Sequence, residues 1–323
     1  MLSLFKSNNP LVVLLYLPLL AALRILPFIK PTAFGTPGSP AEPLTQLLWN
    51  ILSQNNTWLI AAGMLLHMVQ AIWVNALVNE HKISARKNYL PGALYITLSA
   101  FLPENMLLSP ASLGLLLIIP AINNVFGLIK KEKMNGALYD AGLLIGLAIC
   151  FYTPYLVLIP FLYAALATLR PVVLREWIVV LLGLLTPFYI MFVIYYIAEW
   201  QAPVLYPRGV LSLIYFPPAS RFGLAALVAA TFVAAASLPG ILFSSVIQVR
   251  KFVSILGLFC LFIAAGYPLQ ATAVSTHFAA LALFTAVVWA MYFTQIKRLW
   301  IAEVMFIMLL LLVAALQWRA FTA

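Results

Sequence analysis

The chain has 323 residues, of which 65% are apolar and only 8% are charged, and its mean hydropathy is +1.06. A soluble domain is about half apolar and about a quarter charged, so this composition excludes a water-soluble fold. The net charge of +10 would suggest nucleic-acid binding in a soluble protein, but here the basic residues form short clusters between apolar runs. That placement is typical of membrane topology, so we expect no nucleic-acid partner.

The longer apolar runs are each sufficient to cross a membrane as a helix. In chain order they lie near residues 10–29, 57–78, 108–129, 174–198, 223–247, 251–267, 272–293 and 299–317. No small-residue cleavage site closely follows the first run, so we expect a retained helix rather than a signal peptide.

Three further runs, 89–103, 135–152 and 154–170, are shorter than the usual span of about 20 residues. The placement of the basic residues indicates that these runs also cross the membrane. The clusters Arg86-Lys87 and Lys130-Lys131 can both face the cytoplasm only if an even number of spans separates them, so 89–103 pairs with 108–129. The same argument between Lys133 and Arg170 predicts a hairpin of two short helices broken at Pro154.

The sequence therefore predicts an all-α, polytopic transmembrane helix bundle of about eleven spans, with a cytoplasmic N-terminus and an external C-terminus. We expect a single transmembrane domain over residues 1–323, in a bacterial inner membrane, with external loops near 31–56 and 201–220. The basic residues expected in the cytoplasm are Lys6, Lys82, Arg86, Lys87, Lys130, Lys131, Lys133, Arg170, Arg175, Arg250, Lys251, Lys297 and Arg298. Those expected outside are Arg24, Lys30, Arg208, Arg221 and Arg319.

The first external loop contains a helical pattern of apolar residues. Its leucines and isoleucines recur at helical spacing from Leu44 to Leu52, with polar residues such as Thr45 on the opposite face. This pattern predicts an amphipathic helix that lies on the membrane surface or packs on the bundle.

Few carboxylates are available for chemistry, because the chain has only 8 acidic residues. Glu104 lies at the external turn between two spans and is the best candidate acid, although solvation or helix capping would also explain it. Glu42, in the first external loop, is the other candidate. Glu80 and Glu176 lie beside Lys82 and Arg175, and we expect each to pair with that neighbour.

The histidines and cysteines do not predict a metal site. His67 falls midway through its span and His277 near the external end of its span, and neither has a second ligand at metal-binding spacing on its own helix. Cys150 and Cys260 lie within apolar runs, as core residues do. Asn123 and Asn124 predict hydrogen bonds between helices. We expect no metal and no cofactor.

Several motifs of membrane enzymes and pumps are absent from the sequence: the Walker loop, H-E-x-x-H and G-x-S-x-G. There is also no ladder of intramembrane carboxylates and no inverted repeat with matched broken helices. Transport is accordingly the least favoured function.

Residues 85–200 carry a family resemblance. The segments that match are 101–104, 108–110, 136–148, 151–155, 169–177 and 183–188. They resemble an uncharacterised family of bacterial inner-membrane proteins. The same stretch is more distantly similar to the helical core of the GT-C glycosyltransferases, in which a small-residue helix like that from Ala141 to Ala148 precedes a hairpin.

The resemblance implies that a sugar is taken from a polyprenyl-phosphate lipid at the outer face of the membrane. GT-C enzymes usually carry an acidic residue, often a pair, early in the first external loop, whereas residues 31–41 contain no carboxylate and Glu42 alone follows. A single glutamate can act as a general base but does not make a divalent-metal site.

The sequence thus predicts a role in cell-envelope biogenesis. As an enzyme, the chain would use Glu42 or Glu104 as the base and Arg208, Arg221 and His277 to bind the substrate, with a guanidinium on the lipid phosphate. Its partners would be membrane lipids, including polyprenyl phosphate. The alternative is a non-catalytic subunit or scaffold that docks other membrane proteins through small-residue faces such as residues 225–236.

Overall fold

The structure is a computed structural model, and it describes residues 2–29, 44–45, 56–129, 135–197, 218–243, 245–269, 275–296 and 298–322. Within these residues the chain is all-α and has no strand. The longer helices are α2 (Tyr16–Leu23), α5 (Asn56–Glu80), α6 (Leu90–Ser99), α7 (Pro110–Gly127), α8 (Asn135–Phe151), α9 (Leu158–Leu169), α10 (Leu174–Ile197), α11 (Pro218–Phe243), α12 (Ile247–Ala265), α13 (Leu281–Gln295) and α14 (Leu299–Thr322). The short ones are α1 (Leu2–Phe5), η1 (Pro10–Leu15), α3 (Ile25–Ile29), η3 (Pro103–Met106), η4 (Thr153–Val157), η5 (Tyr267–Leu269) and η6 (Ser275–Ala280).

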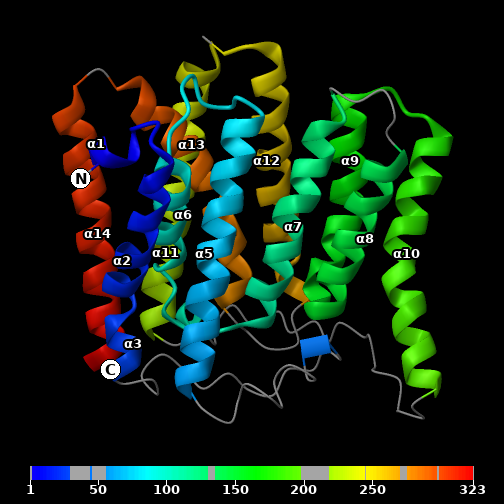
Figure 1. The fold of residues 1–323 in the computed structure, drawn as a ribbon, viewed down its shortest axis with the longest axis horizontal. Helices are drawn as coiled ribbons and strands as arrows, with labels where there is room; N and C mark the ends of the chain where they lie inside the picture. Colours follow the sequence, from blue (N-terminus) through cyan, green and yellow to red (C-terminus); the bar gives the residue numbers. More distant parts are fainter. Residues whose placement is uncertain are drawn as a thin grey trace.

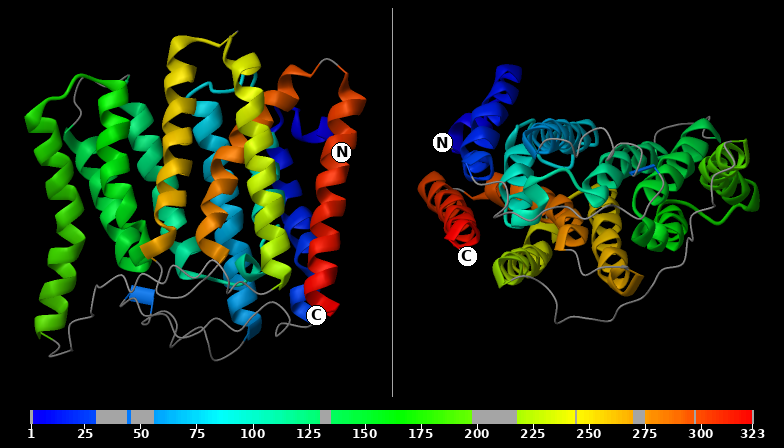
Figure 2. Two further views of the ribbon diagram at one scale, coloured as in Figure 1. Left: turned by 180° about the vertical axis from the view of Figure 1, so that it is seen from behind. Right: turned by 90° about the horizontal axis from the view of Figure 1, so that it is seen from below.

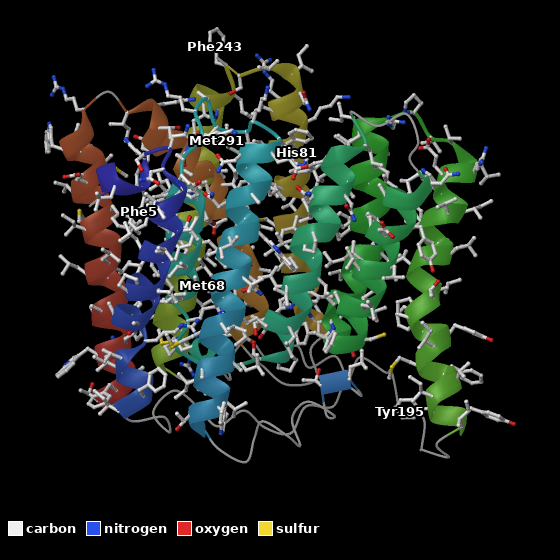
Figure 3. All side chains as sticks on the ribbon, in the orientation of Figure 1. Phe5, Met68, His81, Tyr195, Phe243 and Met291 are labelled. Carbon is white, nitrogen blue, oxygen red and sulfur yellow. The ribbon has the colours of Figure 1, made fainter. Side chains whose placement is uncertain are left out.

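The helices stand side by side and alternate in direction between two ends of one bundle (Figure 1). We call the upper end in Figure 1 the basic end; it holds the turns 81–89 and 170–173 and, among others, Lys82, Arg86, Lys87, Arg170 and Arg298. We call the lower end the Glu104 end; it holds the turns 100–109 and 152–157. Side-chain nitrogens gather at the basic end in Figure 3.

Seven helical stretches of the described chain are long and apolar enough to cross a membrane. They are Thr57–Glu80, Pro110–Gly127, Leu174–Ile197, Ser220–Phe243, Ile247–Ala265, Ser275–Gln295 and Trp300–Thr322. Four shorter apolar stretches, Pro10–Leu23, Leu90–Ser99, Asn135–Phe151 and Thr153–Leu169, accompany them. The short runs predicted from the charge pattern are therefore helical, and the expected break at Tyr152 to Pro154 is the start of η4.

The centre of the bundle is α13 together with η6, because 89% of an apolar 18-residue window within Ser275–Gln295 is buried. This helix packs on α6, α11 and α12. Polar groups join it to α11: Thr231 and Thr285 share a hydrogen bond of 2.8 Å, and the Trp289 indole N–H donates to the carbonyl oxygen of Ala230 at 3.2 Å. Such bonds hold helices together where apolar packing alone gives little specificity.

At one edge of the bundle, α10 packs closely on α8 (Figure 2). A Cβ at Gly183 would lie 2.3 Å from the carbonyl oxygen of Tyr139, and one at Gly142 would lie 2.4 Å from that of Val180, so only glycine allows this approach. The opposite face of α10 exposes large apolar side chains, including Tyr189, Phe192 and Ile197. A membrane or an apolar partner has to cover such a face.

Basic side chains at the basic end hydrogen-bond the carbonyl ends of helices. Arg170 donates to Leu128 at the end of α7, Lys251 to Leu169 at the end of α9, Arg250 to Phe243 at the end of α11, and Lys6 to Phe293 near the end of α13. The last carbonyls of a helix lack intrahelical donors and carry partial negative charge, so these cations stabilise the helix ends. Burial lowers the pKa of Lys6, and the nearby Glu303 carboxylate partly opposes this shift.

Two interfacial carboxylates were predicted to pair with their neighbours in sequence. For Glu176 that prediction is wrong, because its partner is Arg170, at 4.0 Å, and not Arg175. Consecutive residues on a helix point in different directions, so Arg175 cannot face Glu176. Glu80 accepts a hydrogen bond of 3.3 Å from the side-chain amide of Asn123. The side-chain oxygen of Asn123 also bonds His81 Nε2 at 2.9 Å. These contacts join α5 and the turn after it to α7, which confirms the interhelical role predicted for Asn123.

Candidate functional site

Glu104 lies in η3, the short turn of helix between α6 and α7, and its carboxylate joins three segments of the chain. One oxygen accepts a hydrogen bond of 2.8 Å from the Ser220 hydroxyl. The other accepts from Ser275 twice, from the hydroxyl at 2.5 Å and from the backbone N–H at 3.1 Å. Both serines are buried, whereas Glu104 is half-buried. The arrangement fixes the carboxylate at the Glu104 end of the bundle.

Helix geometry explains why a carboxylate is stable there. Ser220 is in the first turn of α11, and Ser275 is the first residue of η6. Helix N-termini expose unpaired N–H groups and carry partial positive charge, so a carboxylate is favoured at both. The capping role that the sequence left open for Glu104 is therefore present. A carboxylate has about four lone-pair sites, and three donors leave roughly one for a further hydrogen bond or a proton.

The other side of η3 is held by a buried arginine. The Arg24 guanidinium is 1% exposed and donates to the carbonyl oxygens of Met106 at 2.6 Å and of Asn105 at 3.4 Å. Arg24 had been predicted among the basic residues on the external side; it lies at the Glu104 end, inside the bundle. No carboxylate among the described residues pairs with it, so main-chain carbonyls of η3 provide its acceptors.

Asn105 connects η3 to α5. Its side-chain amide donates to His67 Nε2 at 3.0 Å and to the carbonyl oxygen of Ser99 at 3.1 Å. His67 Nδ1 lies 2.7 Å from the carbonyl oxygen of Gly63, which can only accept, so Nδ1 carries the proton and Nε2 accepts from Asn105. Both ring nitrogens of His67 thus have partners, Gly63 on its own helix and Asn105 on another segment.

Two glycines let helices approach the loop that contains η3. A Cβ at Gly223 of α11 would lie 2.2 Å from the carbonyl oxygen of Phe101, and one at Gly63 of α5 would lie 3.0 Å from the backbone nitrogen of Leu108. A larger residue at either position would push its helix away from the loop. Glu104 is therefore positioned by close backbone packing as well as by its own hydrogen bonds.

Two of the predicted substrate-binding residues lie next to the serines that hold Glu104. Arg221 follows Ser220 and is exposed. His277 is two residues after Ser275 and is completely buried, with Tyr152, Tyr155 and Phe278 around its ring. Its Nε2 donates to the carbonyl oxygen of Ile263 at 2.7 Å, while Nδ1 is buried without a hydrogen-bond partner.

The structure thus places Glu104, Arg221 and His277 at one end of the bundle. Glu42 and Arg208, the other two candidates, lie outside the described residues, as does most of the predicted surface helix. Its residue Thr45 is described: it is buried and donates to the carbonyl oxygen of Phe151 at the end of α8, at 2.8 Å. Within the described chain, no three His, Cys, Asp or Glu side chains come together as metal ligands.

Sequence reasoning missed Arg24, Asn105, Ser220 and Ser275 as parts of this site. Serines at helix starts are too common to single out. Asn105 follows Glu104 in the sequence, but nothing in the sequence indicated its contact with His67. Arg24 had a usable signal, since an arginine at the end of an apolar run is costly and needs a partner.

No protein-family model matches the chain, and neither does any curated protein or solved structure. The similarity to the GT-C core therefore remains a prediction from residues 85–200.

Proposed function

We propose that the chain is a multi-pass protein of the bacterial inner membrane that acts in cell-envelope biogenesis, on a polyprenyl-phosphate-linked substrate at the outer face. Glu104 is the proton acceptor in this proposal, and Arg221 binds the lipid phosphate. The observation that carries it is the fixed, half-buried Glu104 carboxylate, with an exposed arginine one residue after its partner Ser220. A guanidinium matches phosphate oxygens well, and a positioned carboxylate with one free site can take a hydroxyl proton.

The alternative is a non-catalytic scaffold, and one observation favours it: three donors already occupy Glu104, as a purely structural cap requires. The lipid that stays bound during purification distinguishes the enzyme from the scaffold. Native mass spectrometry of the protein purified in mild detergent should find a bound polyprenyl phosphate in wild type and in Glu104→Gln. Arg221→Gln should reduce it about fivefold, as expected for the loss of about 1 kcal/mol from one phosphate contact.

Arg319→Gln is the matched control, because Arg319 is an exposed arginine at the same end of the bundle. It should leave lipid retention unchanged. Glu42→Ala and Arg208→Ala extend the test to the two candidates outside the described residues. A stoichiometric protein partner with no bound polyprenyl lipid in wild type would refute the enzyme and support the scaffold.

The proposed topology has eleven spans, with the basic end in the cytoplasm and the Glu104 end outside. Single cysteines at Arg86, Arg170 and Arg221 test it, in a background with Cys150 and Cys260 changed to serine. In intact cells a membrane-impermeant maleimide should label Arg221→Cys alone, and after permeabilisation all three variants should react. Labelling of Arg86→Cys in intact cells would show that the orientation is wrong.

A further inference from the structure

A groove lies between α11 and α13 at the basic end, the end opposite Glu104. It has a volume of about 450 Å³ and is lined by Ala236, Ser237, Gly240, Ile241, Tyr292, Gln295 and Ile296. This volume is within the range of about 300–1,000 Å³ found for small-molecule sites. Figure 3 labels Phe243, the last residue of α11, and Met291, one turn before the end of α13.

Gly240 keeps the groove open. A Cβ at Gly240 would meet nothing within 4 Å, in contrast to the glycines at Gly183 and Gly223, where helix packing fills the space. Pro239 precedes it within α11, and proline and glycine are both unfavourable inside a helix. The groove is thus not closed by the packing of its own walls.

The position of the groove on two candidate spans and the residues that line it fit a lipid better than a water-soluble ligand. Both helices are candidate spans, and the groove lies along the last turns of each. Its lining combines aliphatic side chains with the polar Ser237, Tyr292 and Gln295, and tyrosine is typical of the membrane interface. One turn deeper on the same face of α11, Phe232 and Val233 are 72% and 55% exposed, which provides an apolar track for an acyl chain.

The charge beside the groove selects an anionic headgroup. Arg298 is exposed and lies two residues after Ile296 of the lining. Arg250, also exposed, donates to the carbonyl oxygen of Phe243, two residues after Ile241 of the lining. Basic residues near a membrane surface attract anionic lipids.

We propose that this groove is a binding site for an anionic phospholipid, with the headgroup at Arg298 and Arg250 and an acyl chain along α11. The site is separate from the Glu104 end and does not depend on the function proposed there.

The test compares phosphatidylglycerol with phosphatidylcholine, titrated into the detergent-purified protein and counted by native mass spectrometry. Wild type should bind one phosphatidylglycerol at least about fivefold more tightly than phosphatidylcholine, as expected for one basic contact. Gly240→Leu should weaken that binding about tenfold, because leucine fills the groove. Arg298→Gln removes one of the two basic contacts, so it should lower the preference for the anionic lipid about fivefold and leave phosphatidylcholine binding unchanged.

Gly127→Leu is the matched control, because a Cβ at Gly127, at the end of α7, also meets nothing within 4 Å and that position is not part of the groove. It should bind phosphatidylglycerol as wild type does. If Gly240→Leu does not fold, Ala236→Leu fills the same groove from an exposed position. Unchanged phosphatidylglycerol binding in the groove-filling variant, or equal binding of the two lipids by wild type, would overturn the proposal.

Discussion

Glu104→Ala is expected to lower the free energy of unfolding by about 3 kcal/mol, since it leaves buried donors without an acceptor. The substitution removes the partner of the Ser220 hydroxyl and of both the hydroxyl and the backbone N–H of Ser275. Unfolding by titration with SDS, followed by circular dichroism, measures the change.

Two further variants make this result specific. Glu104→Gln should fall between wild type and Glu104→Ala, because the amide keeps one accepting oxygen and loses the other. Asp140→Ala removes an exposed acid from α8 and should change the stability little. Equal stabilities of Glu104→Ala and Asp140→Ala would show that Glu104 does not hold α11 and η6.

Arg24→Ala is expected to cost about 4 kcal/mol, the sum of a cavity and two main-chain carbonyls left without donors. The guanidinium is buried at the Glu104 end and bonds Met106 and Asn105 of η3. Arg24→Met separates volume from charge. It keeps most of the side-chain packing and removes a cation that is costly to bury, so it should be less destabilising than Arg24→Ala.

Arg319→Ala is the control for this prediction, because it removes an arginine from the same end of the bundle. Arg319 is exposed and lies over the ring of Phe222 at 3.8 Å, a contact worth about 0.5–1 kcal/mol. The same unfolding measurement applies. A loss for Arg24→Ala no larger than that for Arg319→Ala would mean that η3 does not depend on Arg24.

The helices could be predicted from the sequence because apolar length and charge placement are local signals. The short helices α6, α8 and α9 are the clearest case. Their length alone does not indicate spans, but the basic residues on either side, such as Arg86 and Arg170, predict through parity that they cross the membrane, and the structure shows them to be helices. Helix pairing, such as that between Gly142 of α8 and Gly183 of α10, was not predicted, since small residues occur on many faces.

The candidate site could be predicted only in part. Glu104 was identified because a carboxylate between two spans is rare in this chain, but Ser220 and Ser275 follow it by more than a hundred residues. His67 likewise looked isolated on its own helix, and its partner Asn105 is on a separate segment. Hydrogen bonds between distant segments depend on how the helices pack, and a single sequence does not contain that information in a readable form.

The cations that cap helix ends at the basic end constrain how the chain can change in evolution. Lys6, Arg170, Arg250 and Lys251 would hold the orientation of the chain in the membrane, and each also stabilises the end of a helix. A substitution that removes one of these charges would therefore weaken the orientation signal and the fold together. Reversal of the chain through gradual loss of basic residues would have to pass through less stable intermediates, which disfavours a population of mixed orientation.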